Sequence, residues 1–170
     1  MRLVRRRLAL VALPAIVLIA GCAVPPRAAV QNDVKNDHWQ GRLSLRLEAD
    51  DPSASARFFS AAFDLKGDVR QGELLLLTPL GTRLATIGWD DQQAWLRTGA
   101  ERRQFASLAH LTQEVLGAEL PLAAVLGWLS GHALLQPGWQ ADLSQQPQGR
   151  ILARRMDPLP AVELRLLLDP

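Results

Sequence analysis

The residue types that support catalysis or metal binding are few and widely separated in this chain. The three histidines have no histidine, cysteine or carboxylate partner at metal-ligand spacing: His38, His110 and His132. Ser130 lies close to His132, but at an expected helix end, where capping is a better explanation than nucleophilic catalysis. The acidic pairs at 50–51 and 90–91 fall where strands are expected to turn, which favours solvated loops over acid/base chemistry. We therefore expect no catalytic residue, no metal site and no cofactor.

Cys22 is the only cysteine, and it ends a segment typical of a bacterial secretory leader. Three arginines at 5–7 precede an apolar run at 8–20, and small residues come before the cysteine. The stretch 19–22 resembles the lipobox of bacterial lipoproteins, which implies that Cys22 becomes the acylated first residue of the mature chain. We expect a leader over 1–21, a lipid anchor at Cys22 and a flexible tether over 22–37, which contains two prolines and has no strand or helix period.

The leader also explains the basic character of the whole chain. The chain has 19 basic and 17 acidic side chains, a formal net charge of +2. Four of the basic residues lie in 1–21, so 15 remain and the net charge of the mature chain is −2. The composition therefore gives no indication of nucleic-acid binding. Because a second cysteine is absent, the domain expected over 38–170 has no intramolecular disulfide and depends on its apolar core.

Alternation of apolar and polar residues predicts strands through most of the domain. In the first of them, Leu43, Leu45 and Leu47 alternate with polar residues. Six short strands are expected before any helix, near 39–48, 59–67, 72–79, 83–89, 94–97 and 101–105. Alternation returns at 139–143, 151–155 and 162–168. The expected order is therefore strands, two helices, strands.

Helical spacing occurs only between 107 and 130. Ser107 is a suitable N-cap and Gly117 a suitable C-terminal residue for the first helix, and the second is expected to start at Pro121 and stop at Gly131. A single antiparallel sheet of this size must curl to bury its apolar face. The predicted fold is mainly β with α (α+β): a curled, unclosed antiparallel β-barrel with a two-helix lid. Periodicity does not decide whether the space under the lid is packed core or an apolar cavity.

The tight connection at Pro79, Leu80 and Gly81 is unusual because its tip is a leucine. Turn tips normally carry polar residues, since an exposed leucine gains nothing from water. Two interpretations follow from the pattern alone. Leu80 either folds back onto the core or enters a membrane or a ligand.

Several motifs together resemble the LolB family of outer-membrane lipoprotein receptors of Gram-negative bacteria. They are the lipobox at Cys22 and the segments 39–42, 60–63, 72–82, 116–122, 128–131 and 163–169. The resemblance covers nearly all of the mature chain. It implies that 38–170 is a lipoprotein-binding domain with a helical lid over an apolar cavity.

The resemblance also implies a function. A member of this family accepts acylated lipoprotein cargo from the periplasmic carrier LolA and inserts it into outer-membrane phospholipid, without ATP or catalysis. It would act as a monomer on the periplasmic face of the outer membrane, anchored by Cys22, with Leu80 matching the family's protruding membrane-insertion loop. Candidates for the acyl-cavity lining are Leu43, Leu45, Phe63, Leu75, Leu77, Ile87, Leu111, Val115, Leu126 and Leu129.

Two other functions remain open at this stage. The first is a lipoprotein of the same architecture that binds a different lipid, because a fold does not determine its ligand. The second is an envelope hydrolase, which would need polar groups that converge in one pocket.

Overall fold

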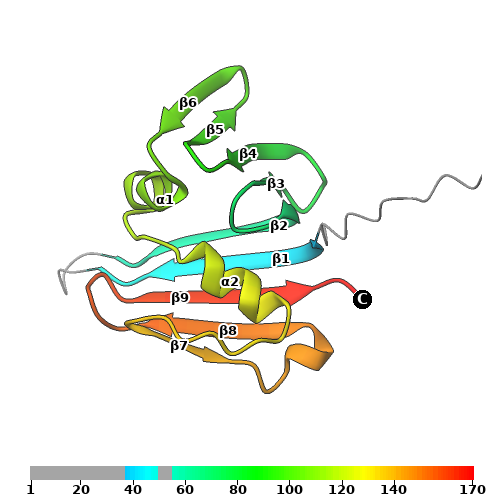
Figure 1. Ribbon diagram of the computed structural model, residues 1–170, viewed down its shortest axis with the longest axis vertical. Coiled ribbons are helices and arrows are strands. Elements are labelled where there is room, and N and C mark those ends of the chain that lie inside the picture. The colour runs from blue at the N-terminus through cyan, green and yellow to red at the C-terminus, as the bar shows by residue number, and fades with distance from the viewer. Residues whose placement is uncertain (1–36, 50–54) are drawn as a thin grey trace, which may run out of the picture. The chain divides into compact units, whose positions relative to one another are not determined.

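The computed structural model describes residues 37–49 and 55–170, and this part of the chain forms nine strands and two α-helices. Figure 1 shows their arrangement. The predicted leader, Cys22, most of the predicted tether and the acidic pair at 50–51 lie outside the described residues. In chain order the elements are β1 His38–Leu47, β2 Arg57–Gly67, β3 Gly72–Leu77, β4 Arg83–Trp89, β5 Ala94–Thr98, β6 Glu101–Phe105, α1 Leu108–Leu116, α2 Leu122–Leu129, β7 Trp139–Asp142, β8 Arg150–Arg155 and β9 Val162–Leu168. The predicted order of strands and helices is confirmed.

All of the strands belong to one antiparallel sheet in the order β6-β5-β4-β3-β2-β1-β9-β8-β7. Within the described residues, no pairing joins β6 to β7, so the sheet is not closed. β1 pairs with β2 through Leu45 and Phe59, and with β9 through Leu45 and Leu164. Because directly paired residues point to the same side of a sheet, these three apolar side chains form a row across its middle.

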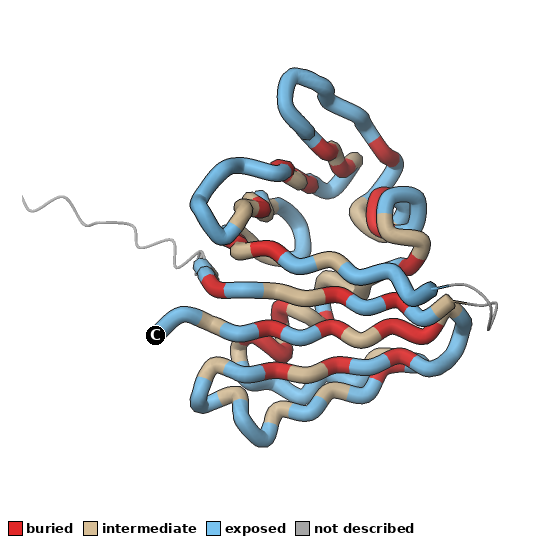
Figure 2. The backbone as a smooth tube through the Cα atoms, turned by 180° about the vertical axis from the view of Figure 1, so that it is seen from behind, coloured by how far each residue is buried: buried red, intermediate tan, exposed pale blue. Residues whose placement is uncertain are grey.

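Alternation along the strands separates an apolar face from a polar one. In β2, Ala61, Phe63 and Leu65 are buried, while the residues between them are more exposed. In β9, Leu164 and Leu166 are buried and the intervening Arg165 is exposed. The same alternation is visible along β1, β9 and β8 in Figure 2. One face of the sheet is therefore available for the core, as the period-2 pattern predicted.

The helix ends follow from local capping. The Ser107 side chain accepts a hydrogen bond from the backbone N–H of His110 (3.1 Å), and α1 ends at Gly117, whose φ is +82°. Both cap predictions are confirmed. In α2 the first helical residue is Leu122, one after Pro121, and the Ser130 hydroxyl donates to the Leu126 carbonyl at the other end (2.9 Å). The Ser130 hydroxyl thus satisfies a helix terminus, as expected from the sequence.

The helices cover the apolar face of the sheet. α2 crosses the strands β1 and β9 in Figure 1, and residues of all three elements line one cavity. Trp128 of α2 is 1% exposed, its ring lies 5.9 Å from that of Trp139, and its indole N–H donates to the Leu134 carbonyl (3.1 Å). Leu111 of α1 is equally buried. The ring contact with Trp139 attaches α2 to β7, and Leu111 places α1 in the same buried apolar cluster as the inward-facing residues of the sheet.

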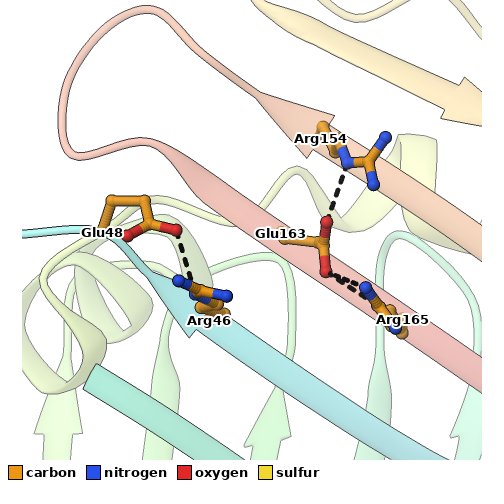
Figure 3. A network of polar contacts seen from close by, with 5 residues as sticks. All are labelled: Arg46, Glu48, Arg154, Glu163 and Arg165. Atoms are coloured by element: carbon orange, nitrogen blue, oxygen red, sulfur yellow. Dashed lines mark hydrogen bonds and ion pairs between the residues drawn. The ribbon is translucent and has the colours of Figure 1, made fainter. Parts of the chain in front are cut away.

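The opposite face of the sheet carries ion pairs (Figure 3). The Glu163 carboxylate accepts hydrogen bonds from Arg154 Nε (2.8 Å) and Arg165 Nε (2.7 Å). Nearby, Arg46 and Glu48 form a separate exposed pair (2.9 Å). The hydrogen bond from Arg154 is the largest influence on the pKa of Glu163; burial opposes it, but with Arg165 the net effect holds the pKa below its ordinary value.

We expect Glu163→Gln to lower the free energy of unfolding by about 1 kcal/mol at neutral pH. A carboxylate whose folded-state pKa is lowered stabilises the protein above its unfolded-state pKa, about 4.3 for glutamate. That contribution disappears as the pH falls through the lowered folded-state pKa. Urea unfolding of the unmodified protein and of Glu163→Gln at several pH values should therefore show a difference in the free energy of unfolding that disappears below about pH 4. Glu48→Gln, in the exposed pair, is the control, and it should change the free energy of unfolding little. A difference between Glu163→Gln and the unmodified protein that stays constant with pH would contradict the prediction.

Candidate functional site

An apolar cavity of about 520 Å³ lies between the sheet and the two helices. A cavity is therefore present where the sequence pattern left packed core and open space as alternatives. Among the described residues that line it, the side chains with polar groups are Arg57, Trp89, Thr98 and Thr112. The indole N–H of Trp89 donates to the Asp68 carbonyl (2.9 Å). The Thr112 hydroxyl is occupied, since it donates to the Ala109 carbonyl (3.0 Å) and accepts from the Leu120 backbone N–H (3.1 Å). The interior thus presents aliphatic and aromatic groups almost exclusively.

The wall of the cavity comes from both layers of the fold. The sheet contributes inward-facing residues of adjacent strands, including Leu45, Leu47, Phe63, Leu65, Leu74, Leu76, Ala85, Leu96, Leu164 and Leu166. The helices contribute Leu108, Leu111, Val115 and Leu116 from α1 and Leu122, Val125 and Leu129 from α2. The lining residues of each helix recur at intervals of three and four, so each helix turns one apolar face toward the sheet.

Most of the predicted lining residues lie in this wall: Leu43, Leu45, Phe63, Ile87, Leu111, Val115 and Leu129. Whether they contact acyl chains remains a prediction.

Leu75, Leu77 and Leu126 do not line the cavity, which corrects three of the predicted positions. In β3, Leu74 pairs with Leu65 and Leu76 pairs with Phe63, so these two leucines share the cavity face. Alternation then places Leu75 and Leu77 on the other side of the sheet. Leu126 is buried, but it lies to one side of the stripe formed by the cavity-facing residues of α2.

Several lining residues were missed by reasoning from the sequence. Leu164 and Leu166 follow directly from the alternation in 162–168, so a signal for them existed. Phe58 and Leu84 lie at strand ends, where no alternation identifies the inward face. For Arg57, no pattern in the sequence marks a charged side chain as part of an apolar wall.

The connection between β3 and β4 presents Leu80 to solvent. The Leu80 side chain is 95% exposed, so the interpretation in which it folds back onto the core is wrong. Thr78 closes the connection: its N–H donates to the Thr82 carbonyl (2.8 Å), and its hydroxyl accepts from the Thr82 N–H (3.1 Å). Gly81 has a φ of +83°, which a residue without a side chain adopts without strain. The loop therefore holds an apolar tip in a compact turn.

This loop lies beside the mouth of the cavity. Leu84, two residues after Thr82, lines the cavity and is 39% exposed. Phe58 and Val115 also line it and are 70% and 40% exposed. Lining residues that are partly exposed mark the place where the cavity meets solvent. Leu80 thus precedes this partly exposed section of the wall by four residues, in the loop that leads into β4.

None of the three histidines lines the cavity. His38 lies 3.0 Å from Asp64, and His110 lies 3.9 Å from Glu114, one helical turn further on, which corrects the expectation that no histidine has a carboxylate partner at such spacing.

Asp90 accepts backbone hydrogen bonds from Gln92 (2.8 Å) and Gln93 (2.9 Å), and these bonds hold the pKa of its carboxyl below the ordinary value. Asp90 and Asp91 therefore form a solvated turn, as expected. Across residues 37–49 and 55–170, no group of three or more histidine, cysteine or acidic side chains is placed to hold a metal ion. None of the helices described there is long and apolar enough to cross a membrane.

A second depression, of about 550 Å³, lies on the polar face of the sheet. Its lining mixes apolar side chains such as Ile151 and Leu152 with the charged side chains Arg42, Arg150 and Arg165. A charged surface of this kind does not favour an acyl chain, because charged groups would lose water without gaining partners. The apolar cavity is the better candidate for the functional site.

The fold and the site together define an unclosed antiparallel half-barrel whose helices enclose an apolar cavity. Residues 37–157 match the family model described as Outer membrane lipoprotein LolB. The chain belongs to the LolB family of outer-membrane lipoproteins. This membership places the protein at the outer membrane.

Individual relatives agree with the family match. The outer-membrane lipoprotein LolB of Dechloromonas aromatica is 32% identical over 147 residues, which cover 74% of this chain and 75% of the relative. That of Thiobacillus denitrificans is 30% identical over 193 residues, with 96% of each chain covered. That of Ralstonia nicotianae is 34% identical over 143 residues, with 80% of this chain and 66% of the relative covered.

Proposed function

We propose that the protein accepts lipoproteins from the periplasmic carrier LolA into its apolar cavity and passes them to the outer membrane. The observation that carries the proposal is the apolar cavity of about 520 Å³ with its mouth beside the exposed Leu80. The volume lies within the range of about 300–1,000 Å³ that is usual for ligand pockets. An almost wholly apolar lining suits fatty chains, whose ends carry no groups that need polar partners.

The energetics of acyl chains make such a cavity necessary. Each buried CH₂ is worth about 0.8 kcal/mol, so an acylated protein does not remain in water and must move from one apolar environment to another. A receiving cavity that binds the chains about 1.4 kcal/mol more tightly than the carrier favours transfer tenfold. The bilayer is the final acceptor. The transfer needs neither a covalent step nor ATP.

Leu80 is the residue proposed to enter the bilayer. Pro79 and Leu80 are both exposed, and the loop that carries them adjoins the cavity mouth. A loop that enters the apolar region of the membrane at this point brings the mouth close to the acceptor. The cargo chains then leave the cavity with little exposure to water.

The predicted anchor at Cys22 agrees with this arrangement. A fully extended segment from 22 to 37 spans at most about 50 Å. Tethering at this distance gives the loop a high effective concentration at the membrane, so that even a loop with weak affinity for the bilayer binds it often. We propose that acylated Cys22 holds the domain at the periplasmic face of the outer membrane.

Depletion of the protein in growing cells tests the proposed function. Lipoproteins should then accumulate in the periplasm bound to the carrier LolA, because the step that removes them is missing. The measurement is the amount of lipoprotein that co-purifies with LolA before and after depletion. If the lipoproteins leave LolA at an unchanged rate after depletion, the proposal is wrong. If the purified protein carries phospholipid and no lipoprotein, the alternative is supported, in which a lipoprotein of this fold binds a different lipid.

A further inference from the structure

Arg57 is the charged residue in the wall of the otherwise apolar cavity, as far as the described residues show. It is the first residue of β2, pairs with Leu47 across the sheet, and is exposed. Its guanidinium lies against the C-terminal end of α1, where it would contact a β-carbon placed on Gly117. The side chain therefore connects the sheet to the helix at the rim of the cavity.

Within the part of the chain that the structure describes, no acidic side chain uses the hydrogen-bonding capacity of Arg57. The ion pairs among residues 37–49 and 55–170 do not include it, and neither do their side-chain hydrogen bonds. A guanidinium has five N–H donors and no acceptor. Donors held at the rim of an apolar space are suited to a ligand that brings acceptor oxygens and an apolar body together.

An acylated protein is such a ligand. Its chains are apolar, and the ester and amide bonds that attach them present carbonyl oxygens, which only accept hydrogen bonds. When the chains fill the cavity, these carbonyls come to the rim, because burying them without donors would be costly. Hydrogen bonds from a charged donor are stronger than those between neutral groups.

We propose that Arg57 donates hydrogen bonds to the carbonyl oxygens that join the acyl chains to the cargo, and so fixes the depth at which the chains enter the cavity. This proposal rests on the proposed function, since it assumes that acyl chains occupy the cavity. It adds a specificity that an apolar wall does not have. Esterified chains should bind more tightly than plain hydrocarbon chains of the same length.

Two matched lipopeptides test the proposal. One carries two palmitoyl chains through ester bonds, and the other carries two hexadecyl chains through ether bonds, which lack the carbonyls. The full-length protein is anchored in phospholipid nanodiscs, and each lipopeptide competes with a photoreactive lipopeptide for crosslinking to the protein. Partition of each probe into protein-free nanodiscs provides the correction for the bilayer.

The protein should bind the ester lipopeptide about tenfold more tightly than the ether lipopeptide. Arg57→Gln should lower affinity for the ester form about tenfold and leave the ether form unchanged. Arg57→Lys, which keeps the charge but loses the planar fork, should retain part of the preference. Arg70→Gln is the control, because it removes an arginine that lies in the turn between β2 and β3, outside the cavity wall.

Equal binding of the two lipopeptides by the unmodified protein would overturn the proposal. The proposal would also be overturned if Arg57→Gln lowered the melting temperature and reduced the affinity for both lipopeptides equally. Arg57 would then be assigned to stabilising the end of α1. If neither probe competes, the proposed function itself fails. These results are distinguishable from one another.

Discussion

Leu80→Glu is expected to leave folding and cargo acceptance intact and to slow incorporation of lipoproteins into membranes at least tenfold. The leucine is 95% exposed, so the substitution removes no packing from the core. In a bilayer, an inserted leucine contributes about 1.5–3 kcal/mol, and a carboxylate in its place would have to lose its hydration. The measurement is the amount of labelled lipoprotein that passes from LolA to the protein, and then from the protein to liposomes.

Leu135 provides a matched control for this experiment. It is 99% exposed, lies between α2 and β7, and does not line the cavity. Leu135→Glu therefore makes the same chemical change far along the chain from the loop, and both steps should proceed normally. Leu80→Phe should preserve incorporation, since it keeps an apolar tip. Normal incorporation by Leu80→Glu would remove the loop from the mechanism.

Ala85→Trp should abolish acceptance of cargo from the carrier. Ala85 is buried in β4 and faces the cavity, so an indole at this position occupies the space that the acyl chains need. Because the ring enters space that is already present, we expect a loss of stability of no more than about 1–3 kcal/mol. The measurement is transfer of labelled lipoprotein from LolA to the variant, with thermal unfolding to show that the variant is folded.

Ala62→Trp is the control for Ala85→Trp. Ala62 lies in β2 between the inward-facing Ala61 and Phe63, so its side chain points to the opposite face of the sheet. An indole there leaves the cavity unchanged, and acceptance should be normal. If Ala85→Trp fails to fold, Leu129→Trp places the same ring in the cavity from α2. Unchanged acceptance by a folded variant of this kind would show that cargo binds elsewhere.

The fold was predictable because local signals agree along most of the chain. Strict alternation identifies β1, β2 and β9, while Ser107 and Gly117 define α1 through their capping chemistry. Such signals are short-range, and each is readable from a few neighbouring residues. They also explain why the exposed turn at Asp90 was recognised.

The details of the site were less predictable, for physical reasons. Four consecutive leucines in β3 contain no alternation, so only pairing with β2 shows that Leu74 and Leu76 face the cavity. The volume under the helices depends on how far the helices stand from the sheet, which no period encodes. Arg57 reaches the cavity rim because β2 and α1 meet there, a contact between segments that are distant in the sequence.

Binding of acyl chains in the cavity is tested most directly by photocrosslinking with a lipopeptide that carries a diazirine at the end of its acyl chain. After irradiation of the full-length protein in nanodiscs, mass spectrometry identifies the crosslinked residues. Adducts should concentrate on inward-facing residues such as Leu45, Phe63 and Leu129, and Ala85→Trp should remove them. Adducts confined to the polar face around Leu152 and Leu167, or adducts that persist unchanged in Ala85→Trp, would contradict a role for the cavity in holding the chains.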